Sequence, residues 1–169
     1  MRKILNYKIT IVARSPKDIK GVCNALSFIE KNNKSLLKKV QKINGVLIRS
    51  IHSYDNELIL PEKIWVCGTG TVRESSVSYL ASLLIHESVH CIKYEQGSLN
   101  KNFRDEPVAY RAQIMFLKKY GEKREYLYVT KLLKEKYWKK NFISISKNEN
   151  IKSTNNLYNY YKKYTSFFH

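Results

Sequence analysis

The stretch His86-Glu87-Ser88-Val89-His90 carries the most specific pattern in this chain. An α-helix turns once every 3.6 residues, so residues four positions apart lie on one face and His86 and His90 would present their imidazoles side by side. Two imidazoles in this arrangement suit one zinc ion, about 2.0–2.1 Å from each nitrogen. Glu87 lies beside the first histidine, where it is placed to take a proton from a water on the metal rather than to bind the metal itself.

The residues around this stretch predict a buried helix. Between Ser75 and Tyr94 there is no proline and no glycine, and apolar side chains fall on almost every side of the helix. A helix that is apolar all round is typical of a protein interior. Buried polar groups need partners, because an unpaired one is costly, and a metal ion is one such partner. Two core histidines held by ordinary hydrogen bonds are the alternative.

The third ligand of such a centre is expected to be a carboxylate. A catalytic zinc ion usually has three protein ligands and one water. The only histidine after His90 is His169, at the end of the sequence. Glu95 follows His90 by five positions, so it would point away from the face that the two histidines share.

Glu106 is the favoured third ligand, with Asp105 as the alternative. Pro107 suits the first turn of a helix, and one of the two acidic residues would lie at its cap. That helix is predicted to span residues 107–120 and to stop at Gly121. Glu106 would then project from its start toward the first helix. An acidic residue is also favourable at any helix start, with no metal involved.

With these residues in place, the chain resembles the gluzincin branch of the zincin metallopeptidases. The resemblance covers about residues 60–120. It implies zinc binding by His86, His90 and Glu106, with Glu87 as the general base. The run Glu106-Pro107-Val108-Ala109-Tyr110 is similar to the E-x-x-A-Y form of small zincin-like domains. The chain lacks the N-E-x-x-S-D segment that surrounds the third ligand of the thermolysin type.

The resemblance implies an α+β fold in which a small, mostly antiparallel sheet packs on the active-site helix, with further helices C-terminal to it. Zincins bind extended substrates along an antiparallel edge strand that precedes the active helix. Residues 63–68 are the candidate strand, being short and rich in β-branched and aromatic residues and ending in a Gly-Thr-Gly turn. Trp65, Val66 and Cys67 are the expected substrate-binding residues. An ordinary sheet strand is the alternative.

A group that stabilises the developing oxyanion is also expected beyond the metal ligands. Tyr110 lies one helical turn beyond Glu106 and is the first candidate for this catalytic role. His52 is a weaker candidate. Plain packing or a surface position is the alternative for both.

Further elements are predicted along the chain from periodicity and turn residues. They are a strand at residues 3–13, helices at 15–31, 34–43 and 122–138, and a hairpin of strands 46–52 and 58–60. Residues 1–140 are expected to form one zincin-like domain, and residues 141–169 a tail or cap rich in Lys, Asn and Tyr.

The amino-acid composition indicates the cellular compartment in which the protein is expected. Three cysteines without C-x-x-C spacing argue against a disulfide scaffold and favour a reducing compartment. Asn6 and Lys8 interrupt the apolar stretch that a signal peptide would need. No apolar run approaches the roughly 18 residues of a membrane span. We expect a cytoplasmic protein, with secretion by another route left open.

The net charge of +17 admits partners other than a peptide. It would suit nucleic acid, an anionic cell wall or a membrane surface. The basic residues are spread along the chain, and heavy use of Lys, Asn, Ile and Tyr is expected of a protein encoded in AT-rich DNA. The positive charge is therefore attributed to composition.

The expected function is zinc-dependent hydrolysis of peptide bonds in a peptide or protein substrate. The alternatives are an inactive or regulatory metal-bound interaction domain, a basic nucleic-acid-binding protein, and a hydrolase of cell-wall peptides.

Overall fold

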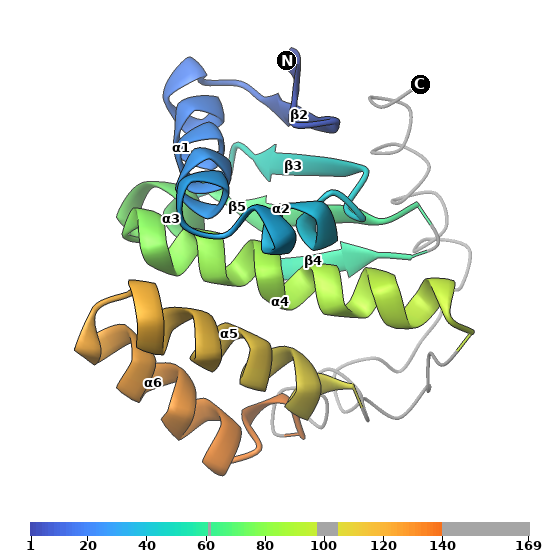
Figure 1. Ribbon diagram of the computed structural model, residues 1–169. Coiled ribbons are helices and arrows are strands. Elements are labelled where there is room, and N and C mark those ends of the chain that lie inside the picture. Colours follow the sequence, from blue (N-terminus) through green and yellow to red (C-terminus); the bar gives the residue numbers. More distant parts are fainter. Residues whose placement is uncertain (61, 98–104, 140–169) are drawn as a thin grey trace, which may run out of the picture.

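The computed structural model describes residues 1–60, 62–97 and 105–139, which form one sheet with helices packed against it (Figure 1). The strands are β1 (Arg2–Asn6), β2 (Ile9–Ala13), β3 (Gly45–Arg49), β4 (Asn56–Ile59) and β5 (Ile64–Gly68). The helices are α1 (Pro16–Asn32), α2 (Lys34–Val40), α3 (Thr69–Glu74), α4 (Val77–Glu95), α5 (Glu106–Tyr120) and α6 (Lys123–Lys134). The predicted tail or cap at residues 141–169 lies outside the described residues.

The five strands form an open sheet in the order β1-β2-β3-β5-β4. The outer pairs, β1 with β2 and β4 with β5, are antiparallel, whereas the inner pairs, β2 with β3 and β3 with β5, are parallel. Parallel neighbours need a crossover connection, and α1 with α2 supplies it between β2 and β3. The predicted α+β class is confirmed. The parallel pairing at the centre of the sheet was not predicted.

The prediction of a single strand at residues 3–13 was wrong, because this segment is a hairpin. Tyr7 and Lys8 turn the chain with φ angles of 50° and 67°. Positive φ at both central residues is the conformation of the two-residue turns that suit the twist of a hairpin. Asn6 and Ile9 face each other across the turn. No glycine marks this turn in the sequence, which is why the alternation of apolar residues suggested one continuous strand.

The predicted hairpin between residues 46–52 and 58–60 was also wrong, because β5 lies between β3 and β4. After β3 the chain packs closely on the junction of β5 and α3. The amide of Gly68 donates to the carbonyl of Asp55 at 3.1 Å, and a Cβ at Gly68 would lie 2.2 Å from the carbonyl oxygen of Ser53. This close approach requires glycine and carries the chain past β5, so that β4 pairs with its far side.

The described helices pack on one face of the sheet. Side chains from α1 to α5 join the inward residues of the strands in one apolar cluster, which includes the fully buried Trp65. A second buried cluster lies on the opposite face, and its members all come from strands: Val12, Leu47, Ile59, Ile64 and Val66. Across the described ranges, no helix combines the length and apolar character needed to cross a bilayer.

Helix α4 lies at the centre of the helical layer, between α1 and α2 on one side and α5 on the other (Figure 1). Its first turn is capped by the side chain of Ser76, which accepts a hydrogen bond from the amide of Tyr79 at 3.0 Å. Ten of its residues are buried, including His86 and Glu87. The predicted buried helix at residues 75–94 is therefore confirmed, and it carries the two histidines into the contact with α5.

Candidate metal centre

Three side chains meet where α4 packs on α5. His86, His90 and Glu106 each bring one ligand atom to within 4.8 Å of the others. Nε2 of His86 lies 3.4 Å from one carboxylate oxygen of Glu106, and Nε2 of His90 lies 3.6 Å from the other. The three side chains are between 10% and 17% exposed. The structure therefore brings together the three residues that the sequence predicted as metal ligands.

The donor set and its spacing are compatible with a divalent metal ion, zinc among them. Two atoms that each lie about 2.0–2.1 Å from a tetrahedral zinc are about 3.3–3.4 Å apart, close to both observed nitrogen–oxygen separations. Among the described residues no fourth ligand joins the two imidazoles and the carboxylate, which leaves a position for water or substrate, as in catalytic zinc sites. A structural zinc site would fill all four positions with protein ligands.

Local structure accounts for this convergence. The histidines are four residues apart on α4, so their rings share a face, with centroids 5.1 Å apart. Glu106 is the first residue of α5, and Pro107 occupies the first turn, where its missing amide hydrogen has no cost. Helices α4 and α5 pack against each other, and this packing brings the side chain of Glu106 to the histidines of α4.

Asp105 does not join the ligand cluster but holds one of its members. Its Oδ2 lies 2.6 Å from Nδ1 of His90. Although Asp105 occupies the N-cap position of α5, its side chain makes no capping hydrogen bond to the helix. A histidine that donates Nδ1–H to a carboxylate presents Nε2 as the ligand atom. The sequence had offered Asp105 only as an alternative ligand, and this supporting role was not predicted.

Burial and the neighbouring negative charges shift the pKa of His90 in opposite directions. Burial by itself lowers the pKa of His90, but the hydrogen bond that its Nδ1–H donates to Asp105 and the negative charges of Glu87, Glu106 and Asp105 together raise that pKa to about 9. The hydrogen bond to His90 in turn lowers the pKa of Asp105 below its usual value. The centre is thus strongly negative apart from its histidines, which favours a cation among them.

Glu87 lies next to His86 on α4 and is 8% exposed. Burial raises the pKa of its carboxyl group, while the nearby imidazoles of His86 and His90 lower it. Glu87 is not part of the three-residue ligand group. A buried carboxyl group beside the donor cluster is placed to transfer protons to and from a group bound there.

Tyr110 packs edge-on against His86, with ring centroids 4.8 Å apart and planes at 83°. Within the described residues, Nδ1 of His86 has no hydrogen-bond partner, so on that side ring packing positions the histidine, while its Nε2 faces the carboxylate of Glu106. Burial raises the pKa of Tyr110 above that of a free tyrosine, so its hydroxyl stays protonated at neutral pH. Tyr110 also contacts Trp138, a contact that the sequence did not predict.

The other candidates lie elsewhere. His52 is exposed and pairs with Glu74 at 3.1 Å. Glu95 pairs with Lys42 and Lys63 at 2.8 and 2.7 Å, in agreement with the prediction that it points away from the histidines. Neither joins the ligand group.

The proposed substrate strand at residues 63–68 is not an edge strand, and this prediction was wrong. β5 pairs with β3 on one side and with β4 on the other, so its backbone hydrogen bonds are made within the sheet. Trp65, Val66 and Cys67 are each fully buried. A strand that is apolar on both faces belongs in the middle of a sheet. The edge strand beside it is β4.

No protein-family model, curated protein or solved structure matches this chain. The candidate metal centre therefore rests on its own geometry. Histidine and carboxylate ligands are compatible with several divalent metals, so the geometry identifies a metal-binding group rather than a particular ion.

Proposed function

We propose that this chain is a zinc-dependent metallopeptidase of the gluzincin type. The observation that carries the proposal is the meeting of His86, His90 and Glu106 with the buried carboxyl of Glu87 next to them. Three protein ligands with a carboxyl group outside the ligand set are what metal-assisted hydrolysis of an amide requires. The order of these residues along the chain matches the resemblance to gluzincins.

Zinc held by His86, His90 and Glu106 would supply a Lewis acid that polarises a carbonyl and lowers the pKa of a water toward about 7. Glu87 takes the proton of the attacking water and passes it to the leaving amine. The raised pKa of Glu87 suits both steps, because the same group must accept and then release a proton. Asp105 keeps the proton of His90 on Nδ1, so that Nε2 faces the cluster.

Tyr110 is the proposed donor to the developing oxyanion. Its ring is held against His86, and its hydroxyl stays protonated because burial raises its pKa. A fixed donor aimed at developing negative charge is typically worth about 10²–10³ in kcat. We therefore expect Tyr110→Phe to lower kcat while leaving the metal bound.

An extended peptide would lie along β4 rather than β5. Among the described strands, β1 and β4 lie at the two edges of the sheet, and β4 is the edge strand that adjoins β5, so it is the one to which we expect a peptide strand to add. β4 is antiparallel to β5, and β5 leads directly into α3 and α4. A substrate that added to β4 would extend the sheet on the side away from β3.

The test compares wild type with Glu87→Gln in a peptide-hydrolysis assay and in a metal-content measurement. A peptidase is expected to lose turnover on this substitution while keeping zinc, because Glu87 transfers protons and does not bind the metal. A regulatory metal-binding domain would show no hydrolysis in either form. Equal hydrolysis by both forms would remove Glu87 as the general base.

A further inference from the structure

Three aromatic rings form a row that begins at a metal ligand. Tyr110 packs edge-on against His86, with centroids 4.8 Å apart. The ring of Trp138 lies 5.3 Å from that of Tyr110, with the two planes inclined by only 31°. The row therefore leads from the ligand cluster on α4, through α5, to the end of the described chain.

Tyr110 and Trp138 are not part of the hydrophobic core. Neither residue belongs to either of the two buried apolar clusters or to the partly buried residues packed against them. Both are only partly buried. Part of the surface of each residue therefore remains accessible, outside the clusters that stabilise the fold.

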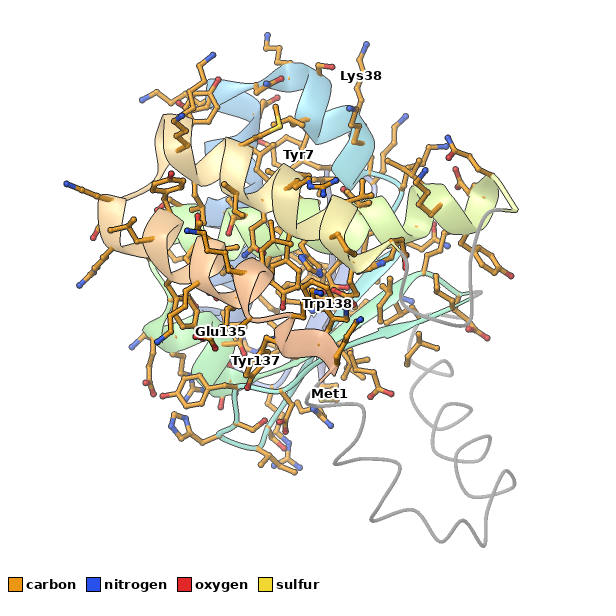
Figure 2. The ribbon with its side chains drawn as sticks, turned by 90° about the horizontal axis from the view of Figure 1, so that it is seen from below. Met1, Tyr7, Lys38, Glu135, Tyr137 and Trp138 are labelled. Carbon is orange, nitrogen blue, oxygen red and sulfur yellow. The ribbon has the colours of Figure 1, made fainter. Side chains whose placement is uncertain are left out.

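The chain turns sharply to place Trp138 in this row. Lys136 adopts a φ of 51°, which is uncommon for a lysine and reverses the chain after α6. Residues 137–139 are again helical. Tyr137 is 40% exposed, whereas Trp138 contacts Tyr110, and the two side chains project to different sides of this turn (Figure 2).

We propose that Tyr110 and Trp138 form an aromatic wall beside the metal centre that binds a flat, apolar side chain of the substrate next to the cleaved bond. This inference rests on the proposed peptidase function and narrows its substrate class to peptides with an aromatic residue at that position. Small-molecule sites are mainly apolar and aromatic, with few polar groups that fix orientation, and here the metal centre supplies those groups. Stacked aromatic pairs also gain more than their buried area alone provides.

The test uses two zinc-binding probes that differ only in a benzyl group, acetohydroxamate and 3-phenylpropionohydroxamate. Their dissociation constants are measured by calorimetry on the zinc-loaded protein, for wild type, Trp138→Ala and Trp138→Leu. Leucine keeps apolar bulk but lacks a flat face, so it replaces the alanine variant if that variant fails to fold. Tyr137→Ala is the matched control, because it changes an aromatic residue in the same turn that lies outside the wall.

We expect wild type to bind the phenyl probe roughly tenfold more tightly than acetohydroxamate, the scale of one stacked ring. Both Trp138 variants should lower this ratio at least about threefold, with zinc content and acetohydroxamate affinity unchanged. Tyr137→Ala should keep the wild-type ratio. An unchanged ratio in the Trp138 variants, with zinc and acetohydroxamate still bound, would overturn the aromatic wall alone. Failure of wild type to bind zinc would overturn the peptidase proposal and the wall with it.

Discussion

Nδ1 of His90 lies 2.6 Å from Oδ2 of Asp105, and both side chains are 12% exposed. This contact decides which nitrogen of His90 is available as a ligand, because a ring that donates from Nδ1 presents the lone pair of Nε2. Asp105 and Glu106 are consecutive residues at the start of α5, and both reach side chains of α4. One chain segment thus supplies a ligand and also orients another.

Substitution of Asp105 is expected to weaken zinc binding without abolishing it. Removing a carboxylate that orients a ligand histidine typically costs about 10–100-fold in metal affinity. Asp105→Ala should fall in this range, and Asp105→Asn should lose less because its amide oxygen can still accept from His90. Zinc affinity is measured by competition with a chelating dye. Glu74→Gln is the control, because it alters the exposed His52–Glu74 pair, and it should leave zinc affinity unchanged.

Glu87→Gln is expected to stabilise the metal-free protein. Burial raises the folded-state pKa of Glu87 above the ordinary value of a glutamate, 4.5. The folded state then binds more protons than the unfolded state, so the free energy of unfolding decreases as pH rises from about 4.5 through the raised pKa. At pH 7, Glu87→Gln should unfold with a free energy higher by roughly 0.5–2 kcal/mol, the usual range of a stabilising substitution.

Urea unfolding of wild type and Glu87→Gln, both metal-free, at pH 5 and pH 8 tests the direction of this difference in the free energy of unfolding. The difference in favour of Glu87→Gln should be larger at pH 8, because the stability that the raised pKa gives to the wild type is lost as the pH rises above the unfolded-state pKa. A variant less stable than wild type at pH 8 would show that the buried carboxylate is satisfied in the folded protein and carries no cost.

Glu125→Ala is expected to loosen α6 from the start of α4. The carboxylate of Glu125 accepts hydrogen bonds from the hydroxyls of Ser76 and Ser78, and Glu125 is only 8% exposed. Its removal leaves the two serine hydroxyls bonded only to each other in this group and takes away the acceptor of the Glu122 amide. Loss of these charged hydrogen bonds should cost about 1–3 kcal/mol. Urea unfolding should register this loss, whereas Arg124→Ala, at a side chain that is 80% exposed, should change stability by less than about 0.5 kcal/mol. Equal effects of the two substitutions would contradict the anchoring role.

Local sequence patterns predicted the helices of this fold better than its strand pairing. Residues 75–94 lack proline and glycine, and the structure places α4 there at Val77–Glu95. Pairing depends on contacts between distant segments, so β5 was predicted at an edge although it lies inside the sheet. The turn at Tyr7 and Lys8 was missed because its positive φ angles occur at residues that rarely adopt them.

The parts of the candidate site that could be predicted are the residues whose positions follow from regular spacing along a helix or from a helix start. His86 and His90 follow from helical periodicity, and Glu106 follows from the helix start at Pro107. The contact of Asp105 with His90 was not predictable, because either acidic residue at this start could have faced α4. Trp138 was missed because its place depends on a chain reversal at Lys136, not on the periodicity of α6.

The most direct test of the metal centre is the zinc content of the purified protein after equilibration with zinc and removal of free ion. Plasma mass spectrometry should find one zinc per chain for wild type, because His86, His90 and Glu106 bring ligand atoms to one point. Glu106→Ala should lose at least about 100-fold in affinity, more than loss of an outer carboxylate such as Asp105. Wild type without stoichiometric zinc, or Glu106→Ala with undiminished affinity, would contradict the proposed centre.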